Sequence, residues 1–332
     1  MATGQIRVLG IVTVFTAVFL AVSACSSPPS STVASLSCGS GGPVPGSDGK
    51  PIRPYQELTM TMSSGEERMF LLRLPEGYDG ETPSDVVFNF HGATSNAHQQ
   101  IAYADFSELA DRDNVIIVAP DANKVYPDRD HELATYWDSA WEGTQRERDH
   151  DIVFVLELVE KLQADYCTGN FYATGMSAGG DMTTALQCVT DGPFLAYAPV
   201  TYRYYHEDEC KRARPRPMIS FHGTEDRVVP LEGLPAPWFD PHVGVIMQSW
   251  AEVNGCDPQA IEESYTENVT RYRWSNCEAK TEWYLIEGGG HTWPGGAVRE
   301  DQSHTTPEIS ASEMIWDFFF EANQDARSAP VG

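Results

Sequence analysis

Short apolar runs along the chain alternate with stretches in which apolar residues recur at helical spacing. The runs have the length and composition of buried strands, and they lie at 86–90, 115–119, 171–174, 194–198, 218–221 and 282–286. The helix-like stretches between or after them lie at 97–111, 151–164, 182–189, 243–253 and 307–322. Buried strands that alternate with helices predict the α/β class, with a mostly parallel central sheet in a single domain and helices on both of its faces.

Two departures from this alternation lie in the first half of the chain. Segments 57–62 and 68–74 are strand-like and flank the turn Ser63-Ser64-Gly65, which predicts an opening hairpin. After the run at 115–119 and Pro120, a polar stretch that extends through Gly143 is expected to be a long loop.

The first residues have the pattern of an export signal. Arg7 precedes an apolar run that reaches Val22, which is shorter than the roughly 20 residues that a membrane-spanning helix needs. Val22-Ser23-Ala24-Cys25 resembles the processing box of bacterial lipoproteins, in which the cysteine is lipidated. We expect a signal peptide at 1–24, a Ser/Pro/Gly-rich tether at 25–54, a catalytic domain at 55–325 and a tail at 326–332. The protein is then exported, and is either anchored through Cys25 on the extracytoplasmic face or secreted.

Charge and cysteine content narrow the possible partners. A net charge of -26 argues against nucleic acid or anionic lipid bound through a basic surface. No Cys-x-x-Cys or His-Glu-x-x-His pattern occurs, so we expect no metal and no cofactor. With Cys25 set aside, the remaining cysteines are even in number, which favours disulfides in an exported protein: Cys38, Cys167, Cys188, Cys210, Cys256 and Cys277.

A candidate nucleophile lies between a predicted strand and a predicted helix. The strand at 171–174 runs into Gly175-Met176-Ser177-Ala178-Gly179-Gly180. The flanking glycines allow a sharp turn that exposes a serine hydroxyl at a helix N-terminus, as in the nucleophile elbow of α/β-hydrolases. We therefore expect Ser177 to be the nucleophile.

A serine nucleophile needs a histidine base and a carboxylate that orients it, and in the α/β-hydrolase fold both follow the serine, acid first. Asp226 follows the strand at 218–221 in the segment His222-Gly223-Thr224-Glu225-Asp226, and His291 follows the strand at 282–286 on a glycine-rich loop. We expect these two residues to complete the triad. Less well placed acids are Glu225, Asp208, Asp240 and Asp257, and less well placed histidines are His222, His242 and His304.

The negative oxygen of a tetrahedral intermediate needs fixed N–H donors. In this fold the residue after the nucleophile supplies one, here Ala178, and the loop after the third strand supplies another. That loop is His91-Gly92-Ala93-Thr94, where Ala93 is the expected donor and Gly92 the alternative. His91 is expected to be structural.

The segments GMSAGGDM, FHGTEDRVVP and EGGGHTWPGG together resemble the polyhydroxybutyrate depolymerase and feruloyl esterase group, close to carbohydrate esterase family one. The resemblance spans about Tyr55 to Phe320 and is strongest to esterase lipoproteins of actinobacteria. It implies the α/β-hydrolase fold, the triad named above, and a disulfide between Cys256 and Cys277. It also implies hydrolysis of small or soluble esters, either feruloyl or aryl esters or 3-hydroxybutyrate oligoesters.

Four tryptophans are candidates for the walls of the acyl or alcohol pocket, or else fill core and loop contacts: Trp137, Trp141, Trp238 and Trp293. The alternatives to an esterase are a serine peptidase of the same fold and a surface binding protein without catalysis. An intact Ser, Asp and His set favours the enzyme.

Overall fold

A computed structural model describes residues 38, 54–122, 124–127, 133–137, 150–189, 192–203, 210, 213–234, 241–298 and 304–328. These residues belong to one compact unit, Leu36–Gly332. The expected signal peptide, Cys25 and most of the expected tether lie outside the described residues. Within the described ranges, no helix is both long enough and apolar enough to cross a bilayer.

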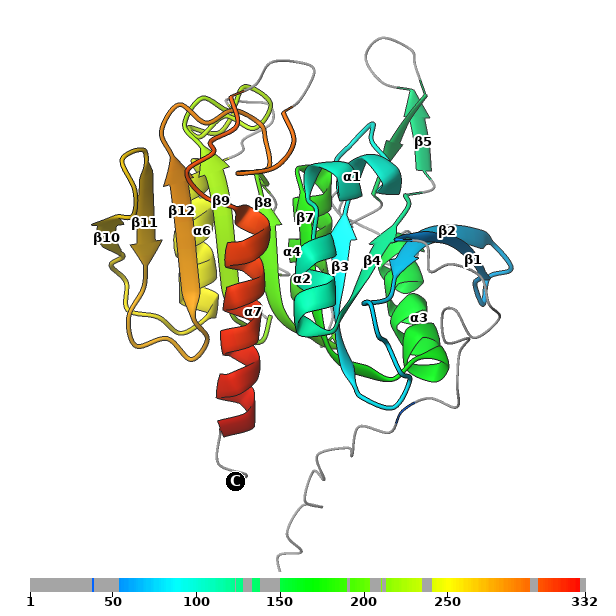
Figure 1. Cartoon of the computed structure of the whole chain (residues 1–332). Helices are drawn as coiled ribbons and strands as arrows, with labels where there is room; N and C mark the ends of the chain where they lie inside the picture. Colours follow the sequence, from blue (N-terminus) through cyan, green and yellow to red (C-terminus); the bar gives the residue numbers. More distant parts are fainter. Residues whose placement is uncertain are drawn as a thin grey trace, which may run out of the picture. The chain divides into compact units, whose positions relative to one another are not determined.

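The described strands form a 10-stranded sheet in the order β1-β2-β4-β3-β7-β8-β9-β12-β11-β10, and a separate hairpin, β5-β6 (Figure 1). Strands β4, β3, β7, β8, β9 and β12 run parallel, and the hairpins at the two edges add antiparallel strands. The bounds are β1 Gln56–Thr61, β2 Glu67–Arg73, β3 Ser84–Phe90, β4 Val115–Pro120, β5 Lys124–Pro127, β6 Leu133–Tyr136, β7 Thr168–Met176, β8 Phe194–Val200, β9 Met218–Gly223, β10 Ile261–Ser264, β11 Val269–Arg273 and β12 Thr281–Ile286. This is the α/β-hydrolase arrangement that the alternation of strands and helices predicts.

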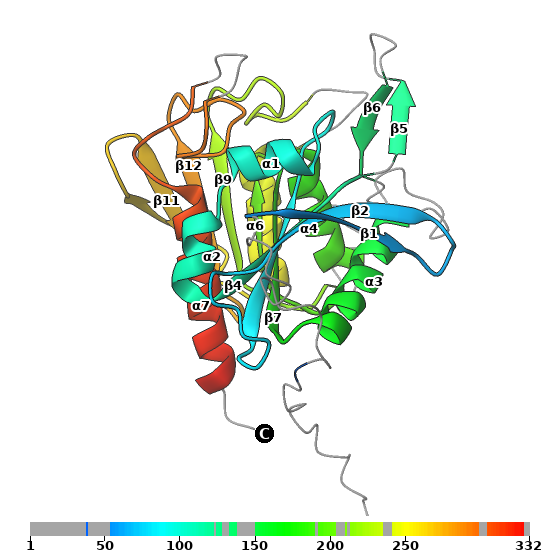
Figure 2. The same cartoon turned by 45° about the vertical axis from the view of Figure 1, so that its right-hand side comes forward.

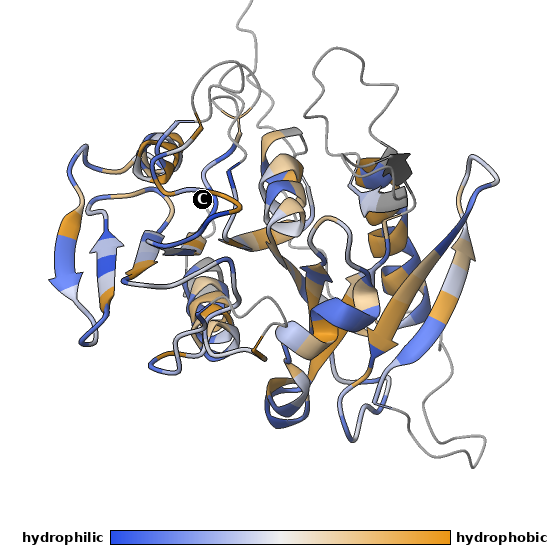
Figure 3. Cartoon of the chain, turned by 90° about the horizontal axis from the view of Figure 1, so that it is seen from above, coloured by the Kyte–Doolittle hydropathy of each residue, from blue (hydrophilic) through white to orange (hydrophobic). Residues whose placement is uncertain are grey.

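Helices cover both faces of the sheet. Successive strand residues point to opposite faces, so each central strand contributes side chains to both cores. Val86 and Phe88 of β3 pack in the core beneath α3 His150–Asp165, α4 Ala178–Val189 and α6 Val243–Val253. Val87, between them, packs in the opposite core beneath α2 Ser107–Asp113 and α7 Ala311–Ser328. Figures 1 and 2 show these two helical layers, and in Figure 3 hydrophobic segments gather between them.

The helix expected at 97–111 is divided into α1 Ala97–Tyr103 and α2 Ser107–Asp113. The side chain of Asn89, buried in β3, donates to the carbonyl oxygen of Ala104 at 3.1 Å. Asp105 then accepts the backbone N–H of Ser107 at 2.8 Å, at the start of the second helix. A buried polar side chain on the neighbouring strand thus takes a carbonyl at the break between the two helices.

The expected long loop before Gly143 contains strands β5 and β6, so that expectation is wrong in part. The hairpin's strands are only four residues each. Strands β10 and β11, at the far edge of the sheet, have no predicted counterpart. Strand β10 is mostly exposed and reads Ile-Glu-Glu-Ser, so it lacks the apolar alternation that marks a strand in a sequence.

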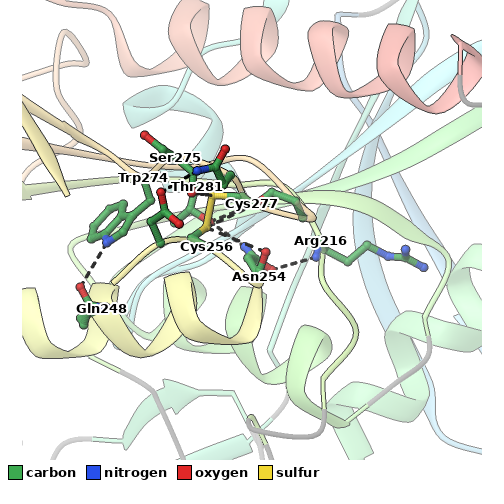
Figure 4. The surroundings of a disulfide bond; sticks show 11 residues. Arg216, Gln248, Asn254, Cys256, Trp274, Ser275, Cys277 and Thr281 are labelled. Carbon is green, nitrogen blue, oxygen red and sulfur yellow. Dashed lines mark hydrogen bonds between the residues drawn. A yellow bond between two sulfur atoms is a disulfide. The ribbon is translucent and has the colours of Figure 1, made fainter. Parts of the chain in front are cut away.

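Three disulfides join the six cysteines that follow Cys25. Cys256 and Cys277 are paired, as the resemblance implied, and the other pairs are Cys38 with Cys167 and Cys188 with Cys210. Around Cys256–Cys277, Asn254 accepts the backbone N–H of Arg216 at 3.0 Å and donates to Thr281 at 2.8 Å (Figure 4). The disulfide therefore lies in a network that fixes the end of α6 against the start of β12.

Candidate active site

Ser177 occupies a strained turn between β7 and α4. Its φ of 56° lies in the left-handed region, which is rare for residues other than glycine. A Cβ on Gly175 would come within 2.5 Å of the Gly179 oxygen, and a Cβ on Gly179 would come within 2.1 Å of the Phe90 oxygen. The two flanking glycines are therefore required by close backbone contacts, and the turn leaves the serine at the amino end of α4.

Asp226 and His291 are in direct contact at the same edge of the sheet. The Nδ1 of His291 lies 2.7 Å from the Oδ2 of Asp226, and the residues are only 5% and 4% exposed. The other carboxylate oxygen accepts the backbone N–H groups of Val228 at 2.9 Å and Val229 at 2.8 Å. The carboxylate is thus held by two backbone N–H groups while it contacts the imidazole.

The loops that carry Asp226 and His291 are joined by backbone contacts. Glu225 donates its N–H to the carbonyl oxygen of Gly289 at 2.8 Å. A Cβ on Gly223 would come within 2.1 Å of that same oxygen. The loops of Asp226 and His291 are therefore held together by backbone contacts as well as by the contact between the two side chains.

The expected donor loop, His91-Gly92-Ala93-Thr94, lies directly beside Ser177. A Cβ placed on Gly92 would be 3.4 Å from the Ser177 Cβ and 3.9 Å from its Oγ. Within the described part of the chain, the Ser177 hydroxyl is not hydrogen-bonded to His291. In hydrolases without substrate this bond is often long, and it tightens in the substrate complex.

The alternative acids and histidines lie in other environments. Glu225 is exposed, and Asp208 and Asp240 lie outside the described residues. Asp257 accepts a hydrogen bond from Asn276 at 2.7 Å near the Cys256–Cys277 disulfide. His242 caps α6, and the carbonyl oxygen of His304 accepts the N–H of Gly290.

His222 lies close to the acid but is bound elsewhere. Its Nε2 donates to the carbonyl oxygen of Val229 at 2.9 Å and is 3.9 Å from the Asp226 carboxylate. Burial lowers the pKa of His222 below its ordinary value, and the nearby Asp226 carboxylate opposes that shift without cancelling it. The buried ring therefore favours the neutral form.

Trp137 and Trp293, two of the four tryptophans considered for the pocket walls, are buried in the hydrophobic core clusters. Trp293 is 2% exposed and donates to the Ser312 hydroxyl at 3.1 Å. Trp137 is 7% exposed, and its indole N–H donates to the carbonyl oxygen of His91 at 2.7 Å. Trp141 and Trp238 lie outside the described residues.

The β5-β6 hairpin contributes to the site in a way that the sequence pattern did not indicate. The N–H of Thr94 donates to the carbonyl oxygen of Thr135 at 2.9 Å, and the Thr135 hydroxyl donates to the Ser95 carbonyl at 2.6 Å. With Trp137, the hairpin supports the donor loop. The described residues contain no group of three or more His, Cys, Asp or Glu side chains arranged to hold a metal ion.

Known proteins with related sequences are esterases. The chain is 24% identical over 298 residues to feruloyl esterase C of Emericella nidulans, covering 86% of this chain and 96% of that protein. It is also 24% identical over 250 residues to feruloyl esterase B of Piromyces equi, covering 70% of this chain but only 44% of that relative. No family profile matches the chain.

Among solved structures, an acetyl xylan esterase from Aspergillus awamori aligns with a TM-score of 0.56 at 14% identity, over 80% of this chain and 98% of that one. That likeness supports the α/β-hydrolase fold. Fold and related sequences together define the chain as a serine carboxylic ester hydrolase. Its sequence is similar to those of feruloyl esterases, which its motifs also resemble.

Proposed function

We propose that Ser177, Asp226 and His291 are the catalytic triad of this hydrolase. The observation that carries the proposal is the buried 2.7 Å contact between Asp226 and His291, at the sheet edge where the elbow presents Ser177. His291 takes the proton of the Ser177 hydroxyl as it attacks the ester carbonyl, and Asp226 stabilises the imidazolium that forms. His291 then protonates the departing alcohol, and water releases the acid from the acyl-enzyme by the same steps in reverse order.

The backbone N–H groups of Ala93 and Ala178 hold the oxyanion in this proposal. Ala178 is the first residue of α4, so its N–H is among those left free at a helix N-terminus. The positive end of the helix dipole adds to the stabilisation of negative charge there. Each such donor contributes about 10²- to 10³-fold to the rate in related chemistry.

The proposed substrates are small or soluble esters, either feruloyl or aryl esters or 3-hydroxybutyrate oligoesters. Relatives named as feruloyl esterases support the first class. A panel of p-nitrophenyl esters of rising acyl length, methyl ferulate, acetylated xylan and 3-hydroxybutyrate oligomers distinguishes the classes. A preference for ferulate with little dependence on acyl length would exclude the oligoester class.

The protein is further proposed to be exported and anchored through a lipid on Cys25, with a catalytic domain at 55–325. Disulfides between described cysteines are typical of exported proteins. The mass of the mature N-terminal peptide tests the anchor, because a lipidated Cys25 adds the mass of its acyl chains. An unmodified N-terminus beginning elsewhere would contradict it.

A fluorophosphonate probe tests the triad. Peptide mapping of the labelled protein is expected to place the adduct on Ser177, and Ser177→Ala is expected to take no label and to lose about 10⁶-fold in kcat. Folded wild-type protein that hydrolyses esters with Ser177 unlabelled would overturn the assignment.

A further inference from the structure

His91 is the first residue of the donor loop, and its side chain packs in the core. It is fully buried, and its ring lies 4.8 Å from the ring of Trp137. Its Nδ1 is 2.7 Å from the carbonyl oxygen of the next residue, Gly92. Its Nε2 is 3.0 Å from the backbone nitrogen of Ala122 and 3.2 Å from the Asp121 carboxylate. Both ring nitrogens are thus engaged.

These contacts determine where the ring carries its proton. A carbonyl oxygen can only accept, so the 2.7 Å contact with Gly92 requires a proton on Nδ1. The N–H of Ala122 can only donate, so Nε2 accepts from it in the neutral ring. The bond from Nδ1 to Gly92 does not depend on the contact between Nε2 and Asp121.

The bond to Gly92 fixes the orientation of one peptide group. The same carbonyl oxygen also accepts the N–H of Ser95 at 3.3 Å, which closes a turn with Thr94 at a φ of 60°. In a planar trans peptide the N–H points away from the C=O, so the N–H of Ala93 points opposite to His91. Among the described residues, no acceptor receives the Ala93 N–H.

We propose that His91 is a positioning residue for ester hydrolysis: through Nδ1 it holds the Gly92–Ala93 peptide so that the Ala93 N–H faces the oxyanion beside Ser177. The inference rests on the proposed function and goes beyond it, because it assigns a role in the reaction to a residue that touches neither substrate nor triad. The β5-β6 hairpin holds the loop at Thr94 and Ser95, and Trp137 holds it at the His91 carbonyl. None of these contacts reaches the Gly92 carbonyl.

Two substitutions separate the two ring nitrogens of His91. In His91→Asn, the side-chain amide nitrogen takes the place of Nδ1 and keeps a donor for Gly92 while the acceptor for Ala122 is lost. In His91→Gln, the longer side chain can present its oxygen to Ala122, and the donor for Gly92 is lost. Both changes remove one buried hydrogen bond, so they are matched in their expected cost to stability.

The proposal predicts that His91→Gln lowers kcat by about 10- to 100-fold with little change in KM, whereas His91→Asn keeps kcat within about threefold of wild type. The affinity for an aryl boronic acid, which forms a tetrahedral adduct with a catalytic serine, is expected to fall with kcat. A purely structural histidine predicts equal kcat losses in the two variants or none in either. Either result overturns the proposal.

A double-mutant cycle with Ala93→Pro tests whether His91 acts through the Ala93 amide. Proline lacks the N–H and suits this position, the second of the four-residue turn from Gly92 to Ser95. Ala93→Pro is expected to lower kcat by about 10²- to 10³-fold, and His91→Gln is expected to cause no further loss in that background. Losses that multiply would overturn the proposal, and so would a wild-type kcat in Ala93→Pro, even if His91→Gln does not fold.

Fluorophosphonate mapping on each variant separates this proposal from the triad. If Ser177 is labelled in wild type and in both His91 variants, but the two variants have equal kcat, the role of His91 fails and the triad stands. If the active wild-type protein is not labelled at Ser177, the proposed function fails first, and the positioning role fails with it.

Discussion

Two His-Gly dipeptides lie at the carboxyl ends of parallel strands, one on each side of the strand that leads to Ser177. His91-Gly92 follows β3 directly, and His222-Gly223 ends β9. Both histidines are buried, and each binds a backbone carbonyl through a single ring nitrogen. His91 uses Nδ1 on the adjacent Gly92, whereas His222 uses Nε2 on Val229, seven residues away.

The two histidines therefore support their halves of the site in different ways. On the His222 side, Val229 also donates its N–H to Asp226, so the histidine supports the loop that carries the proposed catalytic acid. On the His91 side, the bonded carbonyl belongs to the peptide whose own N–H is the proposed donor. One histidine therefore supports a proposed catalytic side chain, and the proposed role of the other is to orient a backbone group.

The glycines of the two dipeptides differ as well. A Cβ on Gly223 would collide with the Gly289 backbone at 2.1 Å, whereas a Cβ on Gly92 would make only ordinary contacts of 3.4 Å and more. The acid and base loops are thus packed backbone to backbone, and the donor loop has space beside the serine. These contrasts lead to predictions that test whether the two sides of the site differ in this way.

Among the substitutions that test this comparison, the largest effect is expected from Asp226→Asn. An amide in place of the carboxylate favours the wrong tautomer of His291, which in the serine protease triad costs about 10⁴-fold in kcat. KM is expected to change little, because the substrate does not contact Asp226 in the proposed mechanism. Steady-state kinetics with a p-nitrophenyl ester measure both parameters.

Glu225→Gln is the matched control, because Glu225 is the adjacent acid and is exposed. It is expected to keep wild-type kinetics. A near-normal kcat in Asp226→Asn together with a large loss in Glu225→Gln would show that the acid has been misassigned.

The sequence predicts the His222 side of the site better than the His91 side. Asp226 and His291 can be located in the sequence because side-chain chemistry and chain order specify them, and the structure places them 2.7 Å apart. The role proposed for His91 depends on which way a peptide group faces, and no residue type encodes that. The supporting contact from Trp137 was equally hidden, because an aromatic residue in a polar stretch gives no signal of a bond to a distant carbonyl.

Some elements of the fold could likewise be predicted from the sequence, and others could not. Strands β3, β4, β7, β8, β9 and β12 are apolar runs, so burial made them predictable. The edge strand β10 and the hairpin β5-β6 are short or polar and depend on partners far away in the sequence. The break between α1 and α2 depends on Asn89, a buried residue of another element.

A smaller effect is expected from an alanine at each glycine of the two dipeptides. Gly223→Ala forces the His291 loop away from the acid loop, and overpacking of this kind costs about 1–3 kcal/mol of stability. We expect kcat to fall by at least about tenfold with it, since displacements near 1 Å can cost about 100-fold. Chemical denaturation and ester kinetics give the two numbers.

Gly92→Ala provides the comparison for Gly223→Ala. The added Cβ meets no backbone atom closer than 3.4 Å. The free energy of unfolding of this variant is therefore expected to lie within about 1 kcal/mol of the wild-type value. If Gly92→Ala proves the more destabilising of the two, the contrast between a packed acid loop and a roomier donor loop does not hold.

The smallest expected effect is on the pH dependence of folding stability, and it comes from His222. Burial lowers its pKa in the folded protein below the ordinary 6.5, so between these two values the unfolded chain binds a proton that the folded chain does not. Stability contributed by neutral His222 is therefore complete above about pH 6.5 and is lost as the pH falls, by at most about 1.4 kcal/mol per pH unit. In His222→Gln, the amide nitrogen can replace Nε2 as donor to Val229 without titrating. We expect denaturation midpoints measured from pH 7.5 to 5 to fall less steeply for His222→Gln than for wild type. Parallel pH profiles of two folded proteins would mean that His222 is not held neutral, and the support it gives to the Asp226 loop would then have to come from a charged ring.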